Sequence, residues 1–269
     1  MRNTLVIILF AFSTTAFGQL AELGLFGGAT NFMGDVGASG LSVPQGWVGG
    51  MNFRFQFNEH YGLRVSGNYG QIAAKDEMSS WESKKDRNLS FRSTIWEASI
   101  MMEINFFDYV TGSRKKTHSP YIFVGLGIFG FNPQAQYTDG EWYDLQPLST
   151  EGQATSLNAQ GQYGLIGLSL PFGIGYRWSI GNSTSIALEM GFRPTSTDYL
   201  DDASKNYVNP AELASIKGEV AAYFADRSLS QTDKTGYARA NDLNNDWYVF
   251  TGIHLYVALT PKNERCSRF

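Results

Sequence analysis

The sequence predicts an all-β protein, an antiparallel transmembrane β-barrel of about eight strands with long extracellular loops. Three observations predict it: an export signal at the start, a hydrophobic period of two in eight segments, and connections that alternate between short and long. The chain is 17% charged and 14% aromatic and has 29 glycines against 8 prolines. This composition suits a barrel whose lipid-facing and lumen-facing residues alternate, although a soluble β-sandwich shares it.

The first residues are typical of a secretory signal peptide. A short positive start is followed by an apolar run over 5–12, which is too short to span a bilayer as a helix. Ala16-Phe17-Gly18 then supplies a small-x-small cleavage pattern. We therefore assign 1–18 to the signal peptide and 19–269 to one outer-membrane barrel domain. A buried N-terminal helix or strand is the alternative.

The strands are predicted from alternating hydrophobicity. Between Trp47 and Asn58 the odd positions are apolar or glycine, and the even positions carry most of the polar groups. The same pattern predicts strands over 21–31, 47–58, 61–73, 91–106, 121–131, 165–180, 184–195 and 247–259. Each is long enough to cross a bilayer as a tilted strand, which takes about 9–11 residues.

The connections favour a barrel over a sandwich because short and long connections alternate along the chain. Those after the second, fourth and sixth strands are short or moderate, at 58–60, 108–120 and 181–183, and those after the first, third, fifth and seventh are long, at 32–46, 74–90, 132–164 and 196–246. Outer-membrane barrels have short periplasmic turns and long extracellular loops. The parity predicts an integral protein of the cell outer membrane with both termini in the periplasm.

The polar face of each strand is expected to line the lumen, because the apolar face must meet outer-membrane lipid. Four acids and four arginines fall on the inward face: Glu22, Arg54, Arg64, Glu97, Glu103, Arg177, Glu189 and Arg193. An eight-stranded barrel is only wide enough for side chains to fill. We therefore expect these charges to pair and the lumen to be closed, with a proton or ion path through them as the alternative.

Two further patterns concern the barrel rims. Trp47, Trp96, Trp178 and Trp247 lie near strand ends and are typical of interfacial aromatic girdles. In the last long link, Asn209-Pro210 resembles a helix start, and it is followed by apolar residues at helical spacing, Leu213, Ile216, Val220 and Phe224. Gly218 weakens this helix prediction. The apolar stripe covers the barrel itself or docks a partner.

The sequence gives little support for catalysis, cofactors or nucleic acid. No hydrolase elbow, zinc-protease pair or phosphate-binding glycine loop occurs, and His254 is interpreted as an interior packing residue. One cysteine, Cys266, and three scattered histidines exclude zinc and iron–sulfur ligation and leave the role of Cys266 open. A net charge of -4 argues against a nucleic-acid partner.

Two charged clusters are candidate sites. Asp198, Asp201 and Asp202 are possible calcium ligands, although their spacing does not match an EF-hand loop. A basic group is expected on the periplasmic side, formed by Arg114, Lys115, Lys116 and His118 together with Arg265 and Arg268 of the tail. It is either solvated charge or a contact for an acidic periplasmic partner.

Three stretches together resemble the PorG-like family of outer-membrane barrels of the type IX secretion system: ELGLFGGATNFMGDVG at 22–37, FRPTSTDYLDDASKNYVNP at 192–210 and NDWYVFTGIHL at 245–255. The resemblance implies a non-enzymatic accessory protein that positions the periplasmic ring of PorK and PorN, or GldK and GldN, for protein secretion and gliding motility. It does not identify contact residues, and topology favours 111–119 and 261–269. The alternative is a ligand-binding or adhesive barrel that acts through its extracellular loops.

Overall fold

The structure is a computed structural model that describes residues 20–259 except 39, 42 and 231. The predicted signal peptide at 1–18 lies outside the described residues, as do Arg265, Cys266 and Arg268 of the tail.

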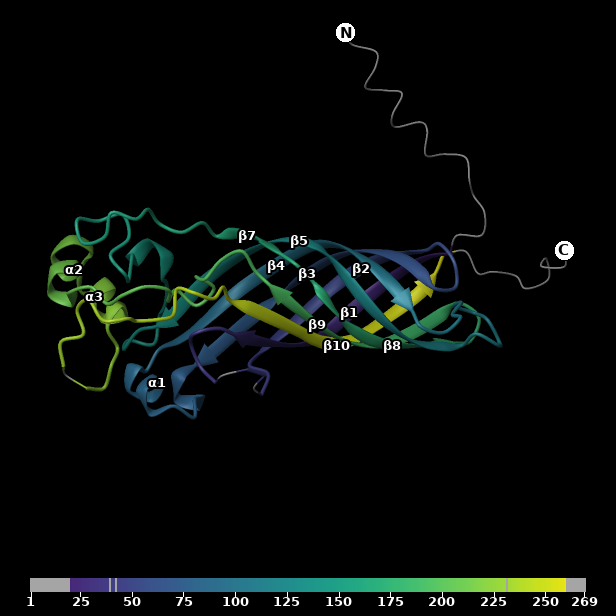
Figure 1. The fold of residues 1–269 in the computed structure, drawn as a ribbon, viewed down its shortest axis with the longest axis horizontal. Helices are drawn as coiled ribbons and strands as arrows, with labels where there is room; N and C mark the ends of the chain where they lie inside the picture. The colour runs from purple at the N-terminus through teal and green to yellow at the C-terminus, as the bar shows by residue number, and fades with distance from the viewer. Residues whose placement is uncertain (1–19, 39, 42, 231, 260–269) are drawn as a thin grey trace, which may run out of the picture.

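The wall is a closed antiparallel barrel (Figure 1). It consists of β1 (Leu20–Met33), β2 (Gly46–Gln56), β3 (Tyr61–Lys75), β4 (Ser90–Asn105), β5 (His118–Gln136), β7 (Ile166–Ser169), β8 (Phe172–Ile180), β9 (Thr184–Pro194) and β10 (Trp247–Ala258). The order around the sheet is β4-β3-β2-β1-β10-β9-β8-β5, and pairing of β4 with β5 closes the ring. Because β7 and β8 occupy one position in the wall, the prediction of an eight-stranded barrel is confirmed.

The strand predicted over 165–180 is interrupted, and the prediction of one continuous strand is wrong. Pro171 separates β7 from β8 because proline has no N–H to give to a ladder. The wall stays closed here, since the Pro171 carbonyl accepts from Gly125 N at 2.8 Å and Leu170 N donates to Pro194 O at 3.0 Å. β5 is longer than predicted and forms a hairpin with β6 (Trp142–Asp144).

The two ends of the barrel differ in their connections (Figure 1). At one end, called the turn end, lie the three short links, the start of β1 and the end of β10. At the other lie the four long links, which together form the cap. The cap contains η1 (Asp76–Met78), α1 (Glu82–Arg87), η2 (Gln146–Leu148), α2 (Pro210–Lys217) and α3 (Glu219–Ala225).

The last long link is partly helical, as predicted. The Asn209 side chain accepts from Ala211 N at 2.9 Å and Glu212 N at 3.3 Å, so it acts as the N-cap of α2. Gly218, with φ of +92°, ends α2 and starts α3. Of the predicted apolar stripe, Leu213 and Phe224 are buried and Ile216 is exposed. Helix α1 was not predicted.

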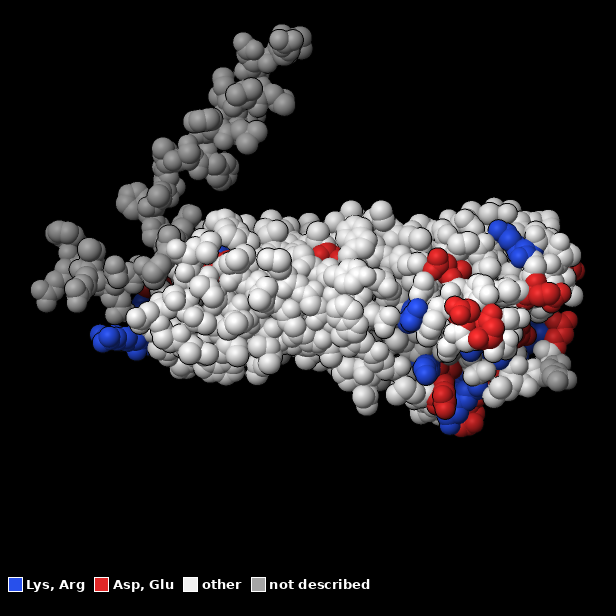
Figure 2. Space-filling model, turned by 180° about the vertical axis from the view of Figure 1, so that it is seen from behind, with Lys and Arg blue, Asp and Glu red and all other residues white. Residues whose placement is uncertain are grey.

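The outside of the barrel is apolar and the inside is polar. Leu25, Met51, Val65 and Ile253 are about half exposed, and Figure 2 shows a wall almost free of charged atoms between two charged ends. Exposed aromatic side chains gather near both rims: Trp47, Tyr69 and Trp96 toward the cap, and Phe57, Tyr61, Phe106, Phe107 and Trp178 toward the turn end. A barrel presents this surface to lipid. In the described part of the chain, no helix has the length and apolarity needed to cross a membrane.

Candidate functional site

The lower lumen, toward the turn end, holds a network of six of the eight predicted charges. Arg54 and Arg64 are direct cross-strand neighbours, and two like charges in such positions repel each other. Glu103 of β4 separates them: it accepts from Arg54 Nε at 2.7 Å, lies 3.2 Å from Arg64 Nε and accepts from Arg177 Nη2 at 2.6 Å. Glu22 forms an ion pair with Arg54 at 2.5 Å, and Glu189 forms an ion pair with Arg64 at 2.6 Å. Three acids therefore balance three arginines.

A second, smaller network lies higher in the lumen. Arg193 Nε donates to Glu97 at 3.2 Å, the Tyr248 hydroxyl donates to the same carboxylate at 2.7 Å, and Asn68 donates at 3.1 Å. The Arg193 guanidinium also lies 4.2 Å from the centre of the Phe250 ring. The pair of Arg193 and Glu97 is neutral, so each of the two networks has no net charge.

His254 and aromatic rings packed over lumen-facing glycines fill the remaining volume. His254 is buried, stacks on Phe26 with ring centres 4.4 Å apart and lies 3.4 Å from Glu189. Gly175 is opposite Tyr121, and a Cβ there would lie only 2.3 Å from the Tyr121 ring. The glycines of this face thus make room for aromatic rings that occupy the lumen.

The turn between β4 and β5 closes the lumen at the turn end. Tyr109 is fully buried, its ring lies 5.9 Å from the Arg54 guanidinium and 5.6 Å from that of Arg177, and its carbonyl accepts from Gln56 Nε2. Its hydroxyl lies 3.0 Å from Thr111 Oγ1, which donates to Glu22. We call Tyr109 and Thr111 the turn plug. Sequence reasoning missed it, because turn residues are ordinarily assumed to be exposed.

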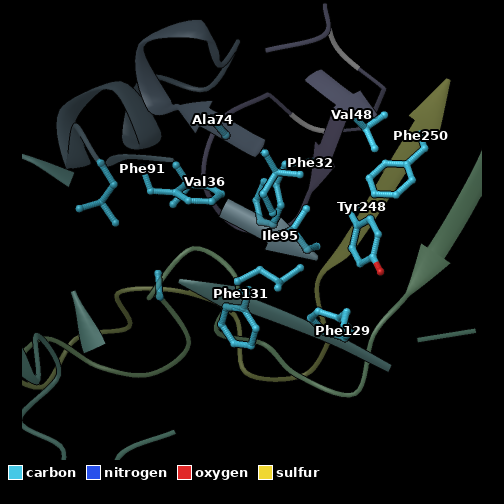
Figure 3. Packing of buried hydrophobic residues seen from close by; sticks show 14 of the residues in the cluster. Phe32, Val36, Val48, Ala74, Phe91, Ile95, Phe129, Phe131, Tyr248 and Phe250 are labelled. Atoms are coloured by element: carbon cyan, nitrogen blue, oxygen red, sulfur yellow. The ribbon is translucent and has the colours of Figure 1, made fainter. Parts of the chain in front are cut away.

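An aromatic cluster closes the opposite end (Figure 3). Phe32, Phe91, Phe129, Phe131 and Tyr248 are buried there, and Phe32 packs edge-to-face on Phe91 at 4.9 Å. Cap residues such as Val36, Leu89 and Leu200 pack against the same cluster. The lumen is therefore filled by paired charges, with the turn plug below and an apolar layer above.

The cap is organised by two buried arginines that sequence reasoning did not single out. Arg87 makes two hydrogen bonds to Asp76, at 2.8 and 2.9 Å, and donates to the carbonyls of Asp35 and Arg239, both at 2.7 Å. Arg239 donates to Glu151 at 3.2 Å and to the Asp202 carbonyl at 2.6 Å. These bonds join all four long links into one structure.

In the cap, buried carboxylates outnumber buried cations. Asp201 accepts from Val36 N and Ala203 N, both at 3.0 Å, and Asp246 accepts from Leu200 N at 3.0 Å, while Asp246 Oδ1 and both Asp198 oxygens have no hydrogen-bond partner. Burial raises the pKa of Asp198 to about 7 and that of Asp202 to about 6. Burial, reinforced by neighbouring carboxylates, holds the pKa values of Asp201 and Asp246 well above their usual range.

The three calcium candidates do not converge on one point. Asp202 accepts from Thr150 Oγ1 at 2.5 Å and from the Tyr163 hydroxyl at 2.6 Å, whereas Asp201 faces the backbone of Val36 and Ala203. Within residues 20–259, apart from the three gaps, no group of three or more His, Cys, Asp or Glu side chains is placed to hold a metal ion.

The segments 22–37, 192–210 and 245–255 fold together. β1 pairs with β10, and β10 pairs with β9. Above these strands, Asp201 contacts Val36, Asp246 contacts Leu200, and the Thr195 hydroxyl donates to the Asp246 carbonyl at 2.8 Å. The three stretches therefore run along neighbouring strands of the wall and meet at the rim where wall and cap join.

The basic residues of the turn end are partly neutralised. Lys116 pairs with Glu59 at 2.5 Å and with Asp108 at 3.2 Å. The hydrogen bond that Lys116 donates to Asp108 is the main cause that lowers the pKa of Asp108. His118 Nδ1 lies 2.8 Å from the Tyr176 hydroxyl. Arg114 and Lys115 are exposed at this end.

Fold and lumen together define a transmembrane β-barrel of the outer-membrane type with a filled interior. The chain belongs to the DUF6089 family, described as a domain of unknown function, whose model matches residues 1–217. A comparison with curated proteins found no significant match.

Several solved structures of outer-membrane barrels are similar. Ail of Yersinia pestis, in complex with the heparin analogue sucrose octasulfate, has a TM-score of 0.40 at 9% identity, covering 90% of this chain and 99% of that one. The N-terminal barrel domain of Pseudomonas aeruginosa OprF has a TM-score of 0.36 at 8% identity, covering 88% and 96%. Neisserial surface protein A has a TM-score of 0.38 at 6% identity, covering 90% and 97%.

Proposed function

We propose that this protein is a non-enzymatic anchor in the outer membrane that acts through its two ends and not through its lumen. The observation that carries the proposal is the filled interior: Glu103 alone ties three arginines together, and Tyr109 closes the space beneath them. A path for solutes would require these pairs to separate inside a low-dielectric wall, at a large cost in free energy.

The orientation follows from the connections. Long links in outer-membrane barrels lie outside the cell and short turns lie in the periplasm. The cap would then face the exterior, and the turn end, with the start of β1 and the end of β10, would face the periplasm. In this orientation the exposed Arg114 and Lys115 reach periplasmic partners.

The partner we propose is the periplasmic ring of the type IX secretion system, of the PorK/PorN or GldK/GldN kind, which the barrel would position for secretion and gliding. The resemblance of 22–37, 192–210 and 245–255 to PorG-like barrels supports this choice, and these segments lie on neighbouring strands and contact one another at the cap-side rim. A basic turn would add electrostatic attraction to an acidic ring surface.

Charge reversal at the turn end tests this role. In the variant Arg114→Glu/Lys115→Glu, the ring protein recovered with the barrel after gentle detergent extraction is expected to fall roughly tenfold, because attraction becomes repulsion. Lys75→Glu/Lys217→Glu makes the same change in charge at exposed positions of the cap end and should leave recovery unchanged. Equal recovery from both variants, or intact secretion in a strain that lacks the gene, would contradict the proposal.

A further inference from the structure

A cleft of about 500 Å³ lies in the cap, beside the N-terminus of α2. Its lining comes from two of the four long links: Glu151 and residues 157–160 of the third link, and residues 205–212 and 235–236 of the fourth. The lining is rich in side-chain amides, and its apolar side chains are Leu157, Val208 and the buried Tyr207.

The backbone around the cleft is fixed by hydrogen bonds. Tyr207 N donates to Tyr237 O at 2.9 Å, Gly236 N donates to Tyr207 O at 2.8 Å, and Arg239 N donates to Lys205 O at 2.7 Å. The opposite wall is held by Asn158, whose side chain donates to the Glu151 carbonyl at 3.1 Å. Side chains carried on such a scaffold lose little freedom when they bind a ligand.

Two of the three charged residues of the cleft are already paired within the protein. Lys205 pairs with Asp242 at 3.0 Å, and Glu151 pairs with Arg239 at 3.2 Å and accepts from two backbone N–H groups. Glu212, near the start of α2, is the described carboxylate of the lining without such a pair. The cleft therefore does not favour a strongly charged ligand.

The neutral polar groups, by contrast, remain available. The side chains of Gln160 and Asn206 are exposed and make no hydrogen bond with other described residues. Asn209 uses its amide oxygen to cap α2, which leaves its amide nitrogen as a donor. A carboxamide both donates and accepts, and a hydroxyl does the same. Several such groups around one space match a ligand with many hydroxyls.

We propose that this cleft binds a neutral saccharide, with Asn206 and Gln160 bonded to its hydroxyls and Leu157 and Val208 against the apolar face of a sugar ring. A peptide is the alternative ligand, and competition by short peptides tests it. The neighbouring cleft of about 520 Å³ is lined mainly by charged residues, including the pair of Asp86 and Lys234 at 2.7 Å, and is not part of the proposed site.

The test measures binding of neutral oligosaccharides to the purified full-length protein in detergent. Maltohexaose, isomaltohexaose, mannohexaose and chitohexaose are titrated by calorimetry and followed by saturation-transfer NMR. At least one is expected to bind with a Kd on the order of 10⁻⁴ M, and Asn206→Ala should weaken that binding roughly tenfold through one lost hydrogen bond. Thr232→Ala in the neighbouring cleft is the matched control, and this variant should bind the same sugar with the affinity of the wild type.

Folding of the variants is not at issue, because the Asn206 side chain is exposed and makes no hydrogen bond with other described residues. Failure of all four sugars to bind at about 10 mM would overturn the proposal. So would binding that Asn206→Ala leaves unchanged, or displacement of the bound sugar by a mixture of short peptides. None of these outcomes depends on a periplasmic partner, so this proposal and the anchoring role fail separately.

Discussion

Replacement of Glu103 by glutamine is expected to lower the free energy of unfolding of the barrel by about 3–5 kcal/mol, the usual cost of removing one partner from a buried ion pair. Glu103 is fully buried and contacts Arg54, Arg64 and Arg177. Arg54 Nη2 and Arg177 Nε make no hydrogen bond, so these arginines depend strongly on the carboxylate for compensation. Glutamine has nearly the same shape but no charge, and three buried cations would then face two acids.

The measurement is urea unfolding of the barrel in lipid vesicles, followed by tryptophan fluorescence. Glu59→Gln is the control, since it removes an exposed partner of Lys116 and should cost less than about 1 kcal/mol. The double variant Glu103→Gln/Arg177→Met should recover part of the loss, because it removes a cation that has lost its partner. A Glu103→Gln barrel as stable as the wild type would show that the network does not stabilise the fold.

Raising the pH from about 5 to about 8 is expected to loosen the cap by several kcal/mol. Burial raises the pKa of Asp202 to about 6, so the folded cap holds a proton that the unfolded cap releases near pH 4. The resulting stability is complete below that point and is lost as the pH rises through about 6. For Asp202 the part of this loss that falls between pH 5 and 8 corresponds to about 1.4 kcal/mol, and Asp198, with a pKa of about 7, adds a larger loss in the same direction.

Hydrogen exchange of the cap amides, corrected for the intrinsic pH dependence of exchange, measures this effect. The amides of 198–207 are expected to be protected at pH 5 and to exchange faster at pH 8. Asp246→Asn should reduce the difference, because an amide keeps the bond to Leu200 N and removes the charge beside Asp201. Asp233→Asn alters an exposed carboxylate and should change nothing. Protection that is the same at both pH values would contradict the predicted proton uptake.

The barrel was predictable because each wall residue faces either lipid or a polar lumen, and this contrast appears in the sequence as a period of two. Glu22 and Arg54, for example, fall on inward positions of their strands and are paired in the sheet. The break at Pro171 was missed because the apolar alternation continues across it. The local chemistry of proline outweighed the pattern.

The cap could not be predicted in the same way, because its bonds join distant residues without periodicity. Arg87 and Asp76 are close in sequence, but Arg239 bonds to Glu151 across 88 positions. Asp246 and Val36 were visible only as parts of the distinctive segments at 245–255 and 22–37. The turn plug escaped notice because nothing local distinguishes Tyr109 from an exposed tyrosine; its burial follows from the width of the barrel above it.

Ion conductance of the purified protein in planar lipid bilayers tests most directly whether the barrel is an anchor with a filled lumen. With paired charges across the interior, Tyr109 below them and the aromatic cluster above, the wild type is expected to show no current above that of the protein-free bilayer. Stable, reproducible conductance steps from the folded protein would show an open path through the barrel and would contradict this account.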